Sequence, residues 1–272
     1  ITTVMGGDIM ADQAFNGSRK QRVTFLLNKS RFITSKSEYM DEVIKKISPT
    51  PIRRISWGVD IRYYKPRVNV SKIRQTHSLK ESTQIYLSIR SCQEIYQQDL
   101  IIKSFASFVK KEGLSPENAQ LLIPCFNKND IYLNSLISLV KNLDMVDFIK
   151  FINPIKRSEI PLYLNLADCV ISMAKSDGMP QSLYEAMACG AYPIFGKLTQ
   201  VAELLKNDHN AHLVDINGGA TLSEAFFWSY HNADERLQRI KRNLGLVKKM
   251  ANKKNETKKL HSVYQEILSC AE

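Results

Sequence analysis

This sequence lacks the long hydrophobic runs that membrane proteins need. No run approaches the roughly 18 apolar residues that cross a bilayer as a helix. The first residues, ITTVMGGDIMADQ, also lack the charged and apolar blocks of a signal peptide. The absence of both features predicts a cytoplasmic protein.

Cysteine is scarce and follows no recognisable spacing. The five cysteines are odd in number and mostly lie in apolar runs: Cys92, Cys125, Cys169, Cys189 and Cys270. That pattern suggests neither a disulfide framework nor a zinc site. We expect the cysteines to be small core residues in a reducing compartment.

Acidic residues are outnumbered by basic ones. The chain has 38 Lys and Arg against 27 Asp and Glu, a formal net charge of +11, which favours partners such as anionic lipid or phosphorylated substrates. Residues 241–259 hold eight cations and only one acid, Glu256. Two interpretations stay open for this segment, a solvated helix face and a patch that binds an anionic membrane surface. Without a known RNA-binding motif or interleaved exposed aromatics, we expect no nucleic-acid partner.

From Ile85 onward, short apolar runs alternate with helical patterns. The expected strands are 85–89, 121–124, 147–152, 169–173, 192–195 and 212–215, and the expected helices are 98–112, 130–143, 159–167, 181–189 and 199–206. This alternation predicts a complete doubly wound, Rossmann-like α/β domain over residues 67–250. Ligands in such sheets bind at the carboxyl ends of the strands.

The first 66 residues have a different pattern. A turn-like MGGD and a polar stretch precede an expected strand at 31–35 and an expected helix at 37–47, and a linker then ends at Pro66. We expect Trp57 to pack within that linker. The segment is typical of the last units of another α/β domain, so residues 1–66 are predicted to be the end of an incomplete N-terminal Rossmann-like domain.

The segment 176–193, SDGMPQSLYEAMACGAYP, directly follows an expected buried strand. Gly178 allows a close backbone approach to a ligand, Pro180 suits the start of a helix, and Ser182 is near enough to help cap that helix. The free N–H groups and the positive dipole end of the helix favour an anion. A diphosphate group suits such a site.

Two carboxylates flank this predicted anion site. Asp177 lies in the loop before the helix and Glu185 about one turn inside it, so each can accept hydrogen bonds from hydroxyls on one side of a diphosphate. A nucleotide sugar has this layout. The structural alternative is a plain loop and helix, with Ala186 and Met187 packed inward and Gly190 ending the helix.

Five segments in order carry a family resemblance. They are MGGD (5–8), TSKSEYMDEVIKK (34–46), WGVDIRYYKP (57–66), SIRSCQEIYQQDLIIKSF (88–105) and IPLYLNLADCVISMAKSDGMP (160–180). With the acid pair, they resemble the E-x7-E region and flanking motifs of the retaining glycosyltransferases of family four, the glycosyl transferases group 1 domain. The third segment resembles their nGVD-x-x-x-F-x-P linker.

The resemblance implies a two-domain GT-B fold and a role for each site residue. Glu185 would accept from the ribose hydroxyls, Asp177 and the N–H groups of Gly178 and Met179 would contact the donor sugar, and Arg90 would bind the diphosphate. The implied donor-binding set is Arg90, Asp177, Gly178, Met179, Pro180, Ser182, Leu183 and Glu185, of which Asp177, Glu185 and Arg90 are also the implied catalytic residues.

The implied reaction moves a sugar from a nucleotide diphosphate donor to an acceptor hydroxyl with retention of configuration. It would use no metal and no other cofactor. The acceptor would be a glycan or a lipid-linked glycan. The protein would be cytoplasmic and peripheral at the inner membrane face, in cell-surface polysaccharide or glycolipid assembly. Residues 251–272 would form a basic helix that crosses back to the N-terminal domain.

Four positions depart from the family pattern. Asp177 replaces a glutamate, Tyr96 a lysine, Ile89 a glycine, and Met5 a histidine found in many members. Two alternatives to an active transferase therefore stay open. One is a catalytically silent sugar-nucleotide-binding partner subunit, and the other is a sugar-nucleotide epimerase of the same architecture.

Overall fold

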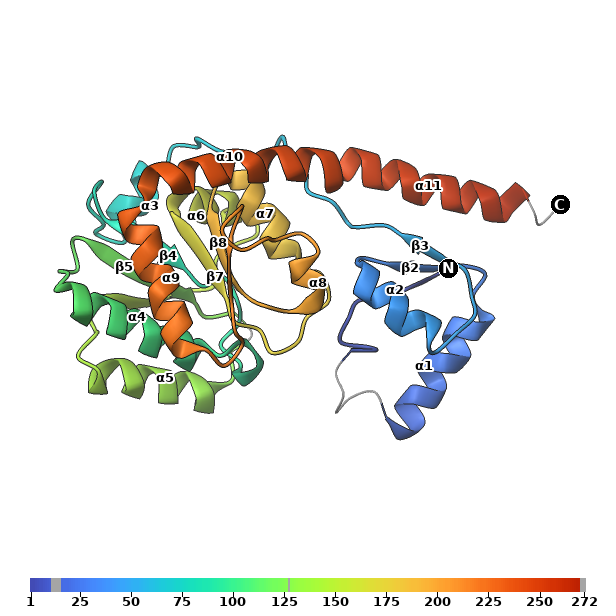
Figure 1. The fold of residues 1–272 in the computed structure, drawn as a ribbon, viewed down its shortest axis with the longest axis horizontal. Helices are drawn as coiled ribbons and strands as arrows, with labels where there is room; N and C mark the ends of the chain where they lie inside the picture. The colour runs from blue at the N-terminus through green and yellow to red at the C-terminus, as the bar shows by residue number, and fades with distance from the viewer. Residues whose placement is uncertain (11–15, 127, 270–272) are drawn as a thin grey trace.

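The protein consists of two parallel β-sheets, each with its own helices, in a computed structural model that describes residues 1–10, 16–126 and 128–269 (Figure 1). We call the parts the smaller and the larger lobe. Cys270, which the sequence placed in the core, lies outside the described residues. Cys92, Cys169 and Cys189 are buried free thiols, as predicted, and Cys125 is partly buried.

The smaller lobe has a three-stranded sheet in the order β1-β2-β3. Its strands are β1 (Thr2–Thr3), β2 (Ile33–Ser35) and β3 (Ile52–Arg54), with helices α1 (Gly17–Lys29) and α2 (Glu38–Lys45). The Ser37 hydroxyl caps α2 by accepting from the Met40 N–H at 3.2 Å. Ile33, Met40 and Ile44 are fully buried and hold the sheet and α2 together.

Several elements differ from the sequence prediction, among them α1, β3 and α8. Helix α1 occupies a segment that the sequence analysis described only as polar. The helix was not predicted because Leu27 is its one buried residue, so its apolar stripe is weak. Strand β3 lies in the segment predicted to be linker and pairs with β2. Helix α8 (Thr199–Ala202) is shorter than the predicted 199–206.

The larger lobe has a six-stranded, all-parallel sheet. Its strands are β4 (Gln84–Leu87), β5 (Ala119–Pro124), β6 (Ile149–Ile152), β7 (Cys169–Ser172), β8 (Tyr192–Gly196) and β9 (His212–Val214). All six predicted strands are confirmed. The spatial order β6-β5-β4-β7-β8-β9 is the 3-2-1-4-5-6 order of the Rossmann fold.

Helices cover both faces of this sheet. They are α3 (Ser71–Thr76), the short 3₁₀ helix η1 (Glu94–Tyr96), α4 (Gln98–Glu112), α5 (Asp130–Asn142), α6 (Ile160–Leu166), α7 (Gln181–Cys189), α8, α9 (Gly219–His231) and α10 (Ala233–Met250). The last helix, α11 (Lys253–Ser269), continues beyond α10 along the smaller lobe. Side chains alternate along β4, where Ile85 and Leu87 join one core cluster and Tyr86 joins the other. The predicted doubly wound architecture is therefore confirmed.

Strands β4 and β7 are neighbours at the centre of the sheet, with Leu87 opposite Val170. From β4 the chain continues to β5 on one side, and from β7 it continues to β8 on the other. The loops that follow these two strands therefore diverge and leave a crevice at their carboxyl ends. Both loops come from segments that the sequence singled out.

Two crossings join the lobes, one through the linker after β3 and one through α11. In Figure 1, α10 and α11 run almost end to end, and α11 extends along the smaller lobe. Val263 of α11 packs with Phe32 and Ile55, and Glu266 pairs with Arg53 at 3.1 Å. Among the described helices, none is long and apolar enough to span a membrane.

Candidate functional site

Arg90 and Asp177 meet at the crevice between β4 and β7. The Arg90 Nη2 atom lies 2.6 Å from Asp177 Oδ2, and both side chains are largely buried. The Arg90 Nη1 atom also donates to the Ser182 hydroxyl at 3.3 Å. The Tyr96 ring lies 4.3 Å from the guanidinium carbon. An aromatic face thus supports Arg90 where the family pattern has a second cation.

Helix α7 begins beside this ion pair. Pro180 is its N-cap residue and no side chain of the described protein caps it, so the N–H groups of Gln181 and Ser182 in its first turn are available for an acceptor. The expectation that Ser182 helps to cap α7 is wrong, because its hydroxyl contacts Arg90 instead. Gly190 ends the helix with a φ of 87°, which favours glycine.

Two residues of the implied donor-binding set have their side chains in the core. Leu183 is fully buried and Met179 is 5% exposed, and both belong to the core cluster on that face of the sheet. The N–H of Leu183 donates to the Pro180 carbonyl at 3.2 Å. Leu183 therefore supports α7 through packing and offers its side chain to no ligand.

We expect Leu183→Ala to lower the free energy of unfolding by about 2–5 kcal/mol, because it leaves a cavity in a close-packed core. Chemical denaturation measures this loss. Leu237→Ala, at a position that is 53% exposed, is the matched control and should change stability by about 0.5 kcal/mol or less. Equal losses in the two variants would contradict the placement of Leu183.

Glu185 lies one turn inside α7 and faces the linker. It borders a cavity of about 360 Å³ with Tyr64, Arg157 and Gln181. Burial raises the pKa of Glu185, while a hydrogen bond from Tyr64 and the charge of Arg157 lower it in part. Sequence reasoning missed Tyr64, although its signal was present, since a tyrosine stands at the Phe position of the linker motif.

The loop after β1 touches the donor-side loop of the larger lobe. Gly6 has a φ of +117°, and a Cβ atom there would lie 2.6 Å from the Gly178 Cα. A Cβ on Gly178 would in turn collide with the Met5 carbonyl oxygen. The Asp8 carboxylate holds this loop by accepting from the N–H groups of Met5 and Gly6, the latter at 2.8 Å. Two glycines thus let the lobes meet backbone to backbone.

Lys36, from the end of β2, is a further charged group near the crevice that the sequence did not reveal. Its Nζ atom lies 3.7 Å from the centre of the Trp57 ring. Burial lowers the pKa of Lys36, and the charges of Asp177 and Asp8 partly oppose that effect. Trp57 is 50% exposed, so the expectation that it packs within the linker is wrong. It forms a platform for an ammonium group instead.

Metal ligation has little support at this site. Within the described ranges, no group of three or more His, Cys, Asp or Glu side chains is placed to hold a metal ion. Cation side chains and helix N–H groups are the groups present to neutralise a phosphate. Metal-independent chemistry remains a prediction from the family resemblance.

A six-stranded parallel lobe of Rossmann order, joined to a second parallel α/β lobe, is the arrangement of a GT-B fold. Residues 69–244 match the family described as "Glycosyl transferases group 1". The match covers well over half of the chain. The protein belongs to this family, as the five sequence segments predicted.

Two curated relatives extend the comparison. The chain is 22% identical over 218 residues to N-acetyl-alpha-D-glucosaminyl L-malate synthase of Bacillus anthracis, covering 79% of this chain and 54% of that protein. It is 24% identical over 158 residues to alpha-monoglucosyldiacylglycerol synthase of Streptococcus pneumoniae, covering 57% of this chain and 33% of that protein. The chain thus spans about half or less of the length of these relatives.

The fold is shared with solved GT-B glycosyltransferases. A crystal structure of Anabaena HepE in complex with UDP and glucose superposes with a TM-score of 0.85 at 15% identity, over 97% of this chain and 70% of that one. The likeness covers both lobes, and it confirms the predicted GT-B architecture. At this identity it supports the fold alone.

Proposed function

We propose that this protein provides the donor site of a retaining glycosyltransferase that moves a sugar from a nucleotide diphosphate to an acceptor hydroxyl. The observation that carries the proposal is the meeting of Arg90, Asp177 and the uncapped start of α7 at the switch point of the sheet. A guanidinium and free N–H groups bind phosphate oxygens, and a carboxylate binds sugar hydroxyls. The UDP and glucose bound to HepE, which shares this fold, support the same class of donor.

In this proposal the protein acts mainly through electrostatics and positioning. Arg90 and the N–H groups of α7 stabilise the negative charge that develops on the departing diphosphate. Asp177 holds the sugar and Glu185 holds the ribose, so the acceptor hydroxyl reaches the anomeric carbon on the face from which the diphosphate leaves. No side chain is assigned as a nucleophile.

The proposed acceptor is a glycan or a lipid-linked glycan. One curated relative is named as a synthase of a glucosyl lipid, and residues 241–259 carry eight cations with one acid. Basic clusters of this kind bind anionic lipid headgroups. We therefore propose that the protein works at the inner membrane face in the assembly of a cell-surface polysaccharide or glycolipid.

Calorimetric titration with UDP tests the donor site. We expect binding that Glu185→Gln weakens by about tenfold or more, because a carboxylate that accepts ribose hydroxyls contributes about 1.5–3 kcal/mol. Glu224→Gln, on the exposed face of α9, is the matched control and should leave the affinity unchanged. If neither UDP nor another nucleoside diphosphate binds, the proposal fails.

The pH dependence of UDP affinity tests the Tyr64 contact. Glu185 must be ionised to accept two hydroxyls, so affinity should fall as the pH falls through its raised pKa. The hydrogen bond from Tyr64 lowers that pKa, so Tyr64→Phe should move the fall to higher pH. Tyr63→Phe is the control, because the Tyr63 hydroxyl donates to the Ser158 carbonyl at 2.9 Å. An unshifted profile in Tyr64→Phe would contradict this role.

Products distinguish the proposed transferase from the two alternatives. Turnover of a UDP-sugar that is lost in Glu185→Gln excludes a silent partner subunit. UDP binding without any turnover supports the silent alternative, which the departures at Ile89, Tyr96 and Met5 favour. An altered sugar formed without an acceptor, detected by NMR, would indicate an epimerase.

A further inference from the structure

Two of the free cysteines lie at the carboxyl edge of the larger sheet, close to Arg90. Cys92 is two residues after Arg90 in the loop that follows β4, and Cys125 directly follows β5. Strands β4 and β5 are parallel neighbours, with Leu87 opposite Leu122. Because the carboxyl ends of parallel strands meet at the same edge, the fold brings together two cysteines that are distant in the sequence.

The two thiols contact each other. The Cys92 and Cys125 side chains share a hydrogen bond, and both residues pack in the same core cluster. Backbone contacts fix each segment. The Asn129 N–H donates to the Cys92 carbonyl at 3.1 Å, and the Cys125 N–H donates to the Ile152 carbonyl at 3.0 Å. Thiols held in contact need only a small movement to form a disulfide, in which the sulfur atoms lie about 2.0 Å apart.

The surroundings of the two thiols give them different reactivity. Cys125 is partly exposed, and its hydrogen bond with Cys92, together with the charge of Lys128, lowers its pKa. Cys92 is buried, and the same hydrogen bond raises its pKa. The thiolate is the form of cysteine that oxidants attack, and a second thiol beside it resolves the product. Cys125 is therefore the thiol that reacts first, and Cys92 is the resolving thiol.

We propose that Cys92 and Cys125 form a reversible disulfide that turns off donor binding by moving Arg90. Hydrogen peroxide is the oxidant in this proposal. The Cys125 sulfur attacks one peroxide oxygen and the O–O bond breaks, which gives a sulfenic acid and, after protonation, one water. The Cys92 sulfur then loses its proton and attacks the Cys125 sulfur, the S–O bond breaks, and a second water leaves. The two thiols are oxidised and the peroxide is reduced.

The position of the two cysteines in the sheet sets the direction of the movement. Only Ser91 separates Arg90 from Cys92. A disulfide draws Cys92 toward β5, whereas Asp177, which pairs with Arg90 at 2.6 Å, follows β7 on the other side of β4. Oxidation therefore pulls Arg90 away from Asp177. The loss of donor binding rests on the role of Arg90 in the proposed function.

Peptide mapping detects the bond. The full chain is treated with hydrogen peroxide and digested with trypsin in the absence of a reductant. Residues 91–103 and 112–128, which trypsin otherwise releases separately, should appear as one linked peptide that dithiothreitol separates. Cys189→Ala removes a buried thiol outside the pair and should link as fully as the unmodified protein, whereas Cys125→Ser should not link. Absence of the linked peptide overturns the proposal.

Calorimetry with UDP measures the consequence for the donor site. Oxidation should weaken UDP binding by about tenfold or more, because a hydrogen bond between charged groups is lost, and dithiothreitol should restore the affinity. Cys125→Ser should bind UDP equally well before and after peroxide, which also shows that the variant is folded. An unchanged UDP affinity in protein that carries the disulfide overturns the proposal.

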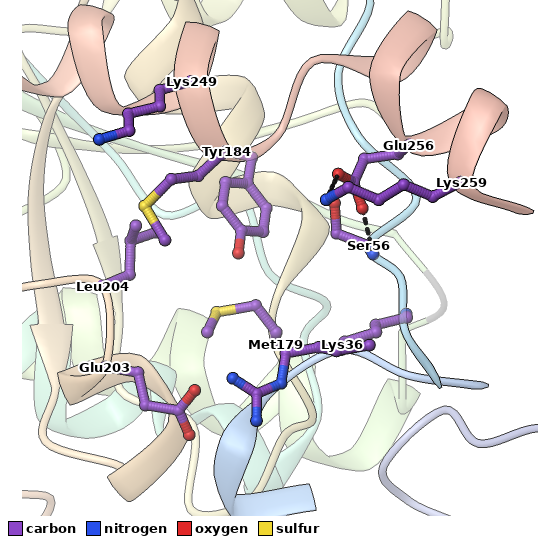
Figure 2. Close-up of a pocket in the computed structure, with 11 residues that line it drawn as sticks. Lys36, Ser56, Met179, Tyr184, Glu203, Leu204, Lys249, Glu256 and Lys259 are labelled. Carbon is purple, nitrogen blue, oxygen red and sulfur yellow. Dashed lines mark hydrogen bonds and ion pairs between the residues drawn. The ribbon is translucent and has the colours of Figure 1, made fainter. Parts of the chain in front are cut away.

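Modification by phenylglyoxal reports the position of Arg90 without UDP. This reagent reacts with accessible guanidinium groups, and the Arg90 side chain is only 14% exposed. Oxidation should accelerate the modification of Arg90 by about tenfold, because the ion pair no longer has to open first. Arg54 is the matched control. It pairs with Asp41 at the same distance of 2.6 Å and lines the cavity between the lobes (Figure 2), so its rate should stay the same.

The failure of this proposal is distinguishable from the failure of the donor site. If the reduced protein binds UDP, but oxidation changes neither the UDP affinity nor the reactivity of Arg90, the disulfide switch is wrong and the donor site stands. If the reduced protein binds no nucleoside diphosphate, but the linked peptide forms and Arg90 reacts faster, the donor site is wrong and the movement of Arg90 stands. Equal acceleration at Arg90 and Arg54 would indicate general unfolding and overturn the proposal.

Discussion

Replacing Arg90 by alanine should weaken UDP binding by about ten- to a hundredfold and lower turnover further. A hydrogen bond between charged groups contributes about 1.5–3 kcal/mol, and each 1.4 kcal/mol is tenfold in affinity. Arg90 is held by Asp177 at 2.6 Å and by the Tyr96 ring, so its guanidinium is already oriented before a donor arrives. Turnover should suffer more than binding because charge on the diphosphate grows as the sugar leaves.

Calorimetry and single-turnover kinetics measure the two effects. Arg22→Ala, on the exposed surface of α1, removes the same charge and should leave both unchanged. Arg90→Lys keeps the charge but cannot contact Asp177 and Ser182 together, so we expect an intermediate loss. Unchanged UDP affinity in Arg90→Ala would place the diphosphate elsewhere.

Gly6→Ala should reduce turnover by about tenfold to a hundredfold. The new Cβ would lie 2.6 Å from the Gly178 Cα, in a backbone conformation with a φ of +117° that side chains rarely adopt. The loops must then move apart, and displacing a reacting group by about 1 Å can reduce the rate a hundredfold. We expect kcat to fall more than KM rises, because the donor residues themselves lie on the larger lobe.

Gly7→Ala is the control for this prediction. A Cβ atom on Gly7 meets nothing within 4 Å, although it adds the same methyl group to the neighbouring residue. Its kcat and its unfolding midpoint should match those of the unmodified protein. If the two variants behave alike, the contact between the loops has no part in the reaction.

The lobes are further joined through α8 and the turn after it. The Gln200 side chain donates to the Asp177 carbonyl, and Glu203 accepts from the first N–H groups of α2. The same short segment therefore contacts the donor loop and the smaller lobe. The sequence predicted this helix as 199–206, but its contacts with both lobes depend on tertiary packing that local periodicity does not encode.

Much of the larger lobe was predictable from local pattern. Buried parallel strands are continuous apolar runs, and the helices between them repeat every three to four residues, so six strands and most helices were found where they lie. Helix α1 was missed because Leu27 is its only buried residue. The role of Ser182 was misjudged because its hydroxyl contacts Arg90, which is distant in the sequence. The role of Trp57 was misjudged because its ring contacts Lys36, which lies on a different element.

The sequence by itself determined the class of fold, the family, and the segment 176–193 with its acids and helix start, because each depends on residues close together in the chain. Only the tertiary structure decided that Arg90 meets Asp177, that Tyr64 contacts Glu185, and that Gly6 faces Gly178. Strand order and the approach of two lobes create those contacts. Both depend on packing between distant segments, which local periodicity does not encode.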